Sequence, residues 1–211
     1  MLEILANHYG RIEWWVAEPF EVMAGAILTQ NTAWRNVEKA LENLKAKGAL
    51  NPESIARMDI KTLAQLIKPS GFYNIKAARL KALAEYLVKE WHGNVTAFLN
   101  QPTHVARAAL LSIKGVGKET ADSILLYAGN HPIMVIDAYT FRILERTGIY
   151  SGRDYDELQH MLMQSIKGSA EDYKYYHALF VEHAKRLCRK RPRCNACPLK
   201  EDCRYENSRT H

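Results

Sequence analysis

The chain has 211 residues, of which 47% are hydrophobic and 25% are charged, and its formal net charge is +6. This length and apolar fraction are enough to bury a hydrophobic core in one or two domains. No apolar run approaches the roughly 18 residues needed to cross a bilayer, and no secretory leader is evident, so we expect a soluble, cytoplasmic protein.

Apolar residues recur at intervals of three and four along nearly the whole chain, which predicts helices. Short breakers rich in Gly, Pro, Asn and Ser separate these segments. Asn51 before Pro52, and Asp154 ahead of two acidic residues, are typical N-caps. No alternating strand pattern occurs, so the predicted fold is all-α. The predicted helices lie within residues 20–28, 37–44, 55–67, 77–87, 105–111, 121–127, 140–147, 158–166 and 175–187.

A glycine-rich turn joins the fifth and sixth of these helices. Gly115 and Gly117 flank Val116 there, and two glycines around one apolar residue allow a tight hairpin and close approach to a ligand. The free amides that begin the second helix suit a phosphate oxygen. A purely structural hairpin is the alternative, but Lys114 and Lys118 beside the turn favour a phosphate contact.

A single aspartate follows the next apolar segment. The run 133–136, Ile-Met-Val-Ile, leads directly into Asp137, which lies 22 residues after Gly115. Asp137 also precedes a predicted helix, so an ordinary N-cap is one interpretation of it. Capping and catalysis do not exclude each other.

All four cysteines lie in the last 24 residues, spaced Cys188-x5-Cys194-x2-Cys197-x5-Cys203. Four thiolates in one short segment can bind a single metal centre, and soft thiolate ligands select zinc or an iron–sulfur cluster. Zinc ribbons usually supply two Cys-x2-Cys hooks, whereas this segment has one. Disulfides are rare in proteins that are not secreted. The pattern favours a 4Fe–4S cluster over zinc or disulfides.

The cysteine segment is also strongly basic. Residues 181–211 hold nine Lys or Arg against four Asp or Glu, a net charge of +5, and the bridge between the first two cysteines contains Arg189, Lys190 and Arg191. Such a patch attracts polyanions, with nucleic acid the leading candidate. An acidic protein, a membrane surface or a solvated loop without a partner are the alternatives.

Taken together, the Gly-Val-Gly-x-x-Thr-Ala stretch at 115–121, the Val-Ile-Asp ending at Asp137 and the four-cysteine loop resemble the helix-hairpin-helix DNA glycosylases of the endonuclease III superfamily. The resemblance implies two helical domains with a cleft between them for DNA and the active site. It implies a six-helix barrel domain over 19–132, with the hairpin at about 108–127. A cluster domain would combine 1–18 with 133–211 and carry the loop 188–203.

The resemblance also implies roles for individual residues. The family places its catalytic carboxylate at the position of Asp137, and its hairpin grips the DNA backbone. Gln30, within Leu-Thr-Gln-Asn-Thr, matches a glutamine that fills the gap left by a flipped-out nucleotide. The four cysteines would hold a 4Fe–4S cluster in a DNA-binding loop. The implied partner is double-stranded DNA with damaged bases, bound by a monomer, without a membrane.

Two departures from the family pattern carry information. Members that cleave the DNA strand hold a lysine at the position of Glu119, and a carboxylate cannot form their Schiff base. Lys118 is adjacent, but one residue turns a helix by about 100°, so its side chain should point elsewhere. We therefore expect base removal without lyase activity. Many members also have six residues between the first two cysteines, where this chain has five.

The tryptophans indicate which base is removed. Trp14, Trp15 and Trp34, with their neighbouring segments, are similar to the bacterial 3-methyladenine DNA glycosylase III branch, where matching residues line the base pocket. Aromatic faces favour a cationic methylated purine by roughly 1–2 kcal/mol per desolvated contact. Core packing is the alternative for each tryptophan. His183 replaces a lysine of that branch and is a pocket candidate, with helix packing as the alternative. Glu119 is also a candidate residue of the base pocket.

Three functions remain open at this point. A monofunctional glycosylase for alkylated purines such as 3-methyladenine leads. A glycosylase for mismatched thymine or oxidised pyrimidines shares everything except the pocket, and the tryptophans disfavour it. A non-catalytic iron–sulfur DNA-binding protein is disfavoured by Asp137.

Overall fold

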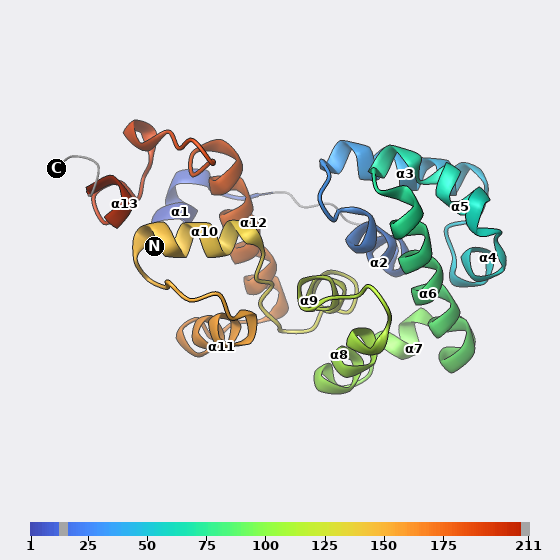
Figure 1. Cartoon of the computed structure of the whole chain (residues 1–211). Helices are drawn as coiled ribbons and strands as arrows, with labels where there is room; N and C mark the ends of the chain where they lie inside the picture. The colour runs from blue at the N-terminus through green and yellow to red at the C-terminus, as the bar shows by residue number, and fades with distance from the viewer. Residues whose placement is uncertain (13–16, 208–211) are drawn as a thin grey trace. The chain divides into compact units, whose positions relative to one another are not determined.

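The computed structural model describes residues 1–12 and 17–207. Within them every regular element is a helix and no strand occurs, so the all-α prediction is confirmed (Figure 1). The chain divides into two compact units. We call Val16–His131 the hairpin unit, and Met1–Trp15 with Pro132–His211 the cysteine unit. No described helix has the length and apolar character that a membrane span requires.

The hairpin unit is built around α2, which is buried along nearly all of its surface. Pro19 occupies the first turn of this helix, where its missing N–H costs nothing. Packing against α3, α6, α7 and α9 covers its apolar sides. The helices of this unit are α2 (Pro19–Leu28), α3 (Trp34–Ala46), α4 (Pro52–Arg57), α5 (Ile60–Leu66), η1 (Lys68–Ser70), α6 (Tyr73–Trp91), α7 (Val95–Leu99), α8 (Thr103–Ser112) and α9 (Lys118–Tyr127).

One predicted helix is two helices in the structure. The segment 55–67 reads as continuous from its apolar spacing, but α4 ends at Arg57 and α5 begins at Ile60. Met58 is extended, and the side chain of Asp59 accepts a hydrogen bond from the Thr62 amide at 3.0 Å. The single helix that was predicted is therefore interrupted at Met58 and Asp59, where Asp59 is the N-cap of α5. The predicted caps at Asn51 and Asp154 are confirmed, because their side chains accept from Ser54 N at 2.9 Å and Glu157 N at 2.8 Å.

A buried ion pair fixes the two helices of the hairpin to each other. Arg107 on α8 donates two hydrogen bonds to Asp122 on α9, at 2.7 and 3.1 Å. The Asp122 side chain is fully buried and the Arg107 side chain is 22% exposed. Removing one partner of such a pair typically costs about 3–5 kcal/mol, because the other charge stays buried. The pair therefore fastens α8 to α9 on either side of the turn.

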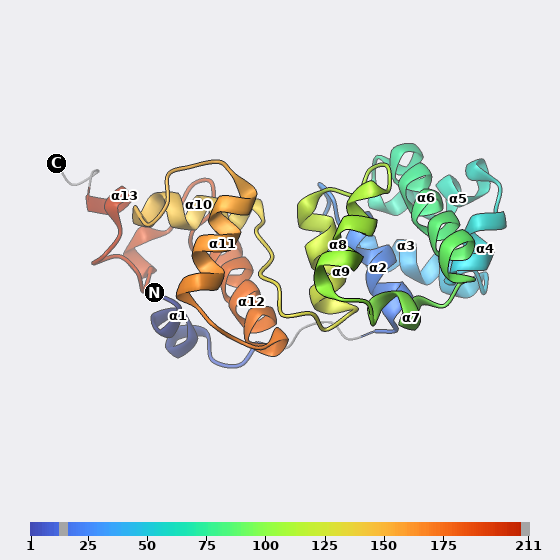
Figure 2. The same ribbon diagram turned by 90° about the horizontal axis from the view of Figure 1, so that it is seen from below.

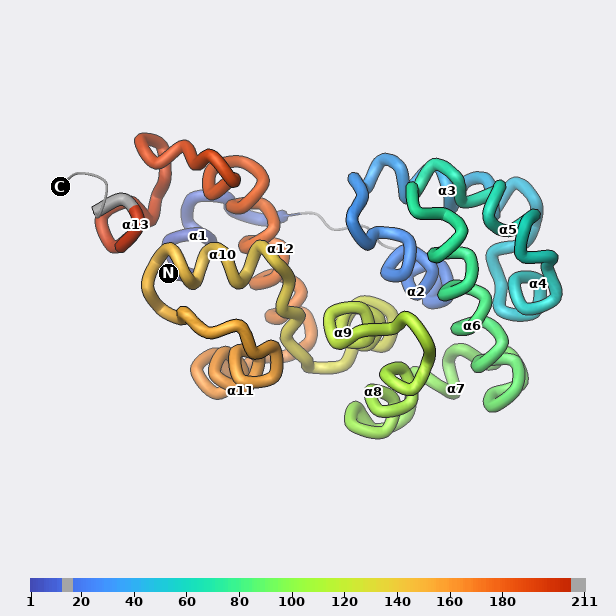
Figure 3. The backbone as a smooth tube through the Cα atoms, in the orientation of Figure 1, coloured from blue at the N-terminus to red at the C-terminus, as the bar shows by residue number. Residues whose placement is uncertain are grey.

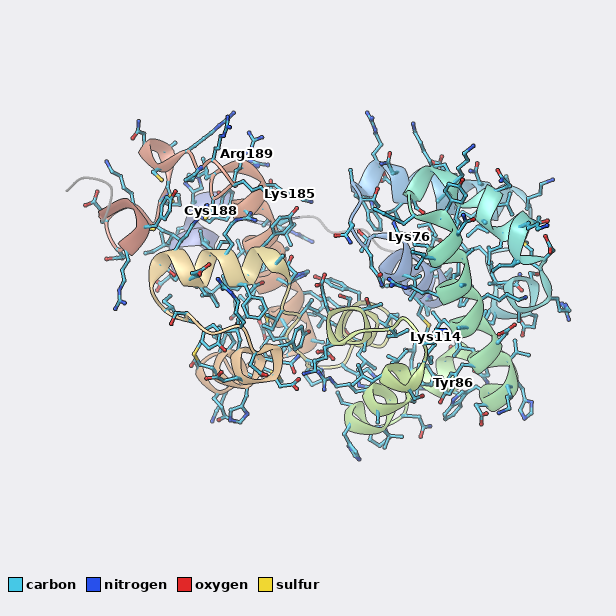
Figure 4. All side chains as sticks on the ribbon, in the orientation of Figure 1. Lys76, Tyr86, Lys114, Lys185, Cys188 and Arg189 are labelled. Carbon is cyan, nitrogen blue, oxygen red and sulfur yellow. The ribbon has the colours of Figure 1, made fainter. Side chains whose placement is uncertain are left out.

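Lys76 holds the loop after α2 in place. Its side chain is 2% exposed, and Nζ donates to the carbonyls of Leu28 at 2.8 Å and Ser70 at 2.6 Å (Figure 4). Burial, followed by the charge of nearby Arg79, lowers the pKa of Lys76. The two carbonyls lie at the ends of α2 and η1, so one lysine ties together two loops that are far apart in sequence.

The cysteine unit contains the first helix of the chain and all helices after residue 137. These are α1 (Leu2–Tyr9), α10 (Ala138–Thr147), α11 (Tyr155–Ser165), α12 (Ala170–Arg186), η2 (Cys194–Ala196) and α13 (Arg204–Asn207). The packing of α1 and α10 against α12 is visible in Figure 2. Leu5 of α1, Leu179 of α12 and Leu199 of the cysteine loop form one buried cluster. Figure 3 traces that loop from the end of α12 to α13.

Candidate functional site

Asp137 is the N-cap of α10. The preceding residues 133–136 are extended into the core and each is at most 5% exposed. One carboxylate oxygen of Asp137, Oδ1, accepts from the Thr140 amide at 2.7 Å and from the Thr140 hydroxyl at 2.9 Å. The expected cap is therefore present, and it uses one oxygen only.

The other oxygen of Asp137 faces a histidine that sequence patterns did not single out. His177 on α12 is 7% exposed, and its Nε2 lies 3.6 Å from Asp137 Oδ2. Burial raises the pKa of Asp137, but His177 and the two hydrogen bonds from Thr140 outweigh it, so the pKa lies below its usual value. Asp137 is therefore ionised at neutral pH although its side chain is only 13% exposed.

The hairpin has the predicted form of two helices joined by a glycine turn. Gly115 has φ of +91°, a conformation that side-chain-bearing residues rarely adopt, and Val116 is buried. Gly117 is the N-cap of α9 and supplies no side-chain cap to the first amides of that helix. Lys114 is exposed and Lys118 is half-buried. The turn thus presents helix N-terminal amides beside two lysines, as an anion site requires.

Gln30 is held by two partners within the hairpin unit. Its Nε2 donates to Thr120 Oγ1 of α9 at 3.0 Å, and its Oε1 accepts from Arg79 Nη1 of α6. Arg79 also lies against the turn, because a Cβ added to Gly115 would come within 2.3 Å of its Cγ. The structure thus brings Gln30 and the hairpin to one place. No local sequence signal marked Arg79 as the residue between them.

The structure describes only some of the predicted pocket residues. Trp34 is half-buried and is the first residue of α3. Glu119 is exposed in the first turn of α9. Trp14 and Trp15 lie outside the described residues. Trp91, which we interpret as structural, packs its ring edge-on against Phe98 with centroids 5.6 Å apart.

The four cysteines, all of them within the described residues, are half-buried and none is in a disulfide. Their side chains line a single cavity. The other residues that line it are Ile143, Arg146, Thr147, His183, Leu187, Pro192, Leu199 and Tyr205. In the part of the chain that the structure describes, no three His, Cys, Asp or Glu side chains converge as around one metal ion. The donor set is therefore the four cysteine thiols that line this cavity.

Two arginines of α10 bind the start of the cysteine loop. Arg146 Nη1 donates to Cys188 Sγ at 3.4 Å and to the Arg189 carbonyl at 2.6 Å, and Nη2 donates to the Lys190 carbonyl at 3.1 Å. Arg142 Nε donates to the Cys188 carbonyl at 2.9 Å. These contacts satisfy the carbonyls of Cys188, Arg189 and Lys190, while the side chains of Arg189 and Lys190 stay exposed.

His183 lies beside the cysteines. It is 1% exposed, its Nδ1 is 3.0 Å from the Tyr9 hydroxyl and its Nε2 is 3.7 Å from Cys197 Sγ. Burial, then the charge of His8, lowers the pKa of His183 to about 4. Burial, then Cys197, raises the pKa of Tyr9 to about 12. Both groups are therefore neutral at physiological pH, and a role of His183 in a base pocket stays a prediction.

The basic bridge is accessible, as a polyanion site requires. Arg189, Lys190 and Arg191 are all exposed. Figure 4 labels Lys185, Cys188 and Arg189 at the end of α12, where the loop begins. The cationic side chains and the cysteine cavity thus belong to the same short segment.

Known proteins match this fold and these motifs. Residues 24–167 match the family described as HhH-GPD superfamily base excision DNA repair protein. A Methanocaldococcus jannaschii protein with the provisional name DNA repair glycosylase is 48% identical over 205 residues, covering 95% of this chain and 93% of that one. Endonuclease III of Thermotoga maritima is 30% identical over 194 residues, covering 91% and 85%.

A solved structure agrees with these relatives. The H. pylori 3-methyladenine DNA glycosylase MagIII, bound to 1,N6-ethenoadenine, is similar with a TM-score of 0.75 and 33% identity, covering 88% of this chain and 95% of that one. The family match, the relatives and the helical fold lead to one assignment: the chain is a base excision repair DNA glycosylase of the HhH-GPD, or endonuclease III, superfamily.

Proposed function

We propose that this glycosylase is monofunctional and hydrolyses the N-glycosidic bond of alkylated purines such as 3-methyladenine in double-stranded DNA. The observation that carries the proposal is Asp137, a half-buried carboxylate whose pKa is lowered. Glu119 at the family's lysine position supports the absence of a lyase step. The similarity to MagIII and the half-buried Trp34 support the choice of base.

The chemistry follows from the leaving group. Methylation gives the purine a positive charge, so the bond between its nitrogen and C1′ breaks with both electrons leaving on a neutral base. The sugar is left as an oxocarbenium ion, which the ionised Asp137 stabilises electrostatically. Water then adds to C1′ and gives up its proton, for which Asp137 is the acceptor. No amine takes part, so the product is an abasic site in an intact strand.

The remaining residues bind and deform the DNA in this proposal. Amides at the start of α9, with Lys114 and Lys118, would contact backbone phosphates. Gln30 would occupy the space that the flipped nucleotide leaves, at a flipping cost of a few kcal/mol. Arg189, Lys190 and Arg191 would add electrostatic contacts that weaken as salt rises.

We further propose that Cys188, Cys194, Cys197 and Cys203 hold a 4Fe–4S cluster. Four thiols around one cavity fit such a group. The single Cys-x2-Cys hook favours a cluster over a zinc ribbon, which usually supplies two such hooks. When bound, the cluster would cross-link the loop and present its cations to DNA.

The cluster proposal predicts colour and composition. The purified protein should be yellow-brown from thiolate-to-iron charge transfer and should contain about four iron atoms per chain. Cys203→Ser should lower the iron content and the colour of the protein, as measured by iron analysis. The hairpin unit should stay folded, as measured by circular dichroism. A colourless protein with one zinc atom per chain would reverse the assignment.

The catalytic proposal predicts that Asp137→Asn abolishes most activity. The amide keeps the cap oxygen but loses the charge, so single-turnover excision should fall by at least about 10²-fold. Asp154→Asn is a control, because Asp154 is also an N-cap in the cysteine unit and its side chain accepts from the Glu157 amide of α11. Its excision rate should equal that of the wild type. Undiminished excision by Asp137→Asn would refute the catalytic role.

The monofunctional proposal predicts that borohydride traps no covalent adduct between the protein and lesion-bearing DNA. Product strands should remain whole until treated with alkali, because Glu119 cannot form an imine. If an adduct does appear, Lys118→Ala should be tested for its loss. A trapped adduct of the wild-type protein would contradict the proposal in either case.

The base assignment predicts an excision profile. On duplexes carrying 3-methyladenine, mismatched thymine or an oxidised pyrimidine, the wild-type protein should remove 3-methyladenine fastest. Trp34→Ala should raise the activation free energy of 3-methyladenine excision by about 1–3 kcal/mol, the typical value of one aromatic–base stack. Binding to abasic DNA should be unchanged. Trp91→Phe serves as the control within the same unit. Preferential removal of a pyrimidine would move the protein to the alternative class.

A further inference from the structure

Two helices of the cysteine unit bring a histidine and an aspartate together in the interior. His177 lies on the face of α12 that packs against α10, where Asp137 is the N-cap. The side chains of His177 and Asp137 are 9% and 13% exposed. Water therefore contributes little to the solvation of either group, and each depends on its protein neighbours.

The two oxygens of Asp137 have different partners. Oδ1 accepts both hydrogen bonds from Thr140, whereas Oδ2 lies toward His177 Nε2 at 3.6 Å. Of the neighbouring titratable groups, α12 supplies His177, and α11 supplies Tyr155, whose hydroxyl accepts from the Ile136 amide at 3.3 Å. His177 is thus the titratable group that acts on the second oxygen directly.

We propose that His177 is a positioning residue of the glycosylase reaction, whose Nε2–H donor holds Oδ2 of Asp137 toward the substrate and keeps the carboxylate ionised. This inference rests on the catalytic role proposed for Asp137. At 3.6 Å the two atoms are somewhat farther apart than in a hydrogen bond, and catalytic hydrogen bonds commonly tighten when substrate binds. Asp137 receives a proton during hydrolysis, and a donor from His177 at Oδ2 disfavours that proton on Oδ2.

The sign of the effect follows from the balance at Asp137. Burial favours the protonated acid, and a donor on Oδ2 favours the carboxylate. The reaction needs the carboxylate, so its rate falls when pH drops through the pKa of Asp137. Removing the donor raises that pKa, and the acidic limb of the pH–rate profile then moves to higher pH. A histidine that only packs between helices would leave the limb in place.

The test compares three variants by single-turnover excision of 3-methyladenine from pH 3 to 8, with spontaneous loss subtracted, because the acidic limb of the wild type lies below the usual pKa of an aspartate. His177→Phe removes the donor and retains a ring, so its acidic limb should move up by about one pH unit or more. His177→Gln retains an N–H donor and should return the limb toward the wild-type position. His160→Gln, at an exposed site on α11, should match the wild type. Affinity for abasic DNA should be unchanged in all three.

A second measurement needs no substitution at His177. The NMR resonance of the His177 Nε2–H proton should move upfield from the wild type to Asp137→Asn, because the acceptor beside it loses its negative charge. An unmoved limb in folded His177→Phe, or an unmoved Nε2–H resonance in Asp137→Asn, overturns the proposal. If Asp137→Asn stays active, the catalytic role fails instead, while the Nε2–H resonance still decides whether the two groups interact.

Discussion

Burial and ionisation compete at the carboxylate of Asp137, and their balance governs what the start of α10 can do. Removal from water favours the neutral acid. The two hydrogen bonds from Thr140 and the proximity of His177 favour the anion, and they prevail. Oδ1 of Asp137 accepts the hydrogen bond of the Thr140 amide, which has no partner within α10. The same hydrogen bond stabilises the charged form of Asp137. Helix formation and chemistry are thus linked at one residue.

The helices that position Asp137 also position the cysteines. Asp137 caps the beginning of α10, and Arg142 and Arg146 near its end bind the chain at Cys188, Arg189 and Lys190. On α12, His177 faces the carboxylate and His183 faces Cys197 about two turns later. Arg146 also stacks over Tyr205 at 4.7 Å, which joins the far side of the loop to the same helix. Two packed helices therefore supply the frame for both candidate sites.

Local patterns predicted most helices and the positions of the hairpin and Asp137, because apolar spacing, capping residues and glycines act over a few residues. They failed at one local cap and at the residues whose partners are set by tertiary packing. The apolar period of 55–67 concealed the cap at Asp59. His177 sits on a helix whose apolar pattern gives no sign of which partner it will meet, and Arg79 joins Gln30 to the hairpin across 49 residues. The roles of these residues could only be raised once the helix packing was known.

The Tyr9–His183 contact has a consequence for biosynthesis. The two residues are 174 positions apart, and α1 buries its apolar face against α12 and Leu199. At about 5–20 residues per second, the ribosome needs on the order of ten seconds or more between making α1 and making its partners. The hairpin unit is complete within that interval, whereas the leucines of α1 stay exposed until α12 and Leu199 have been made. During synthesis, α1 is therefore more open to chaperones and to aggregation than the hairpin unit that follows it.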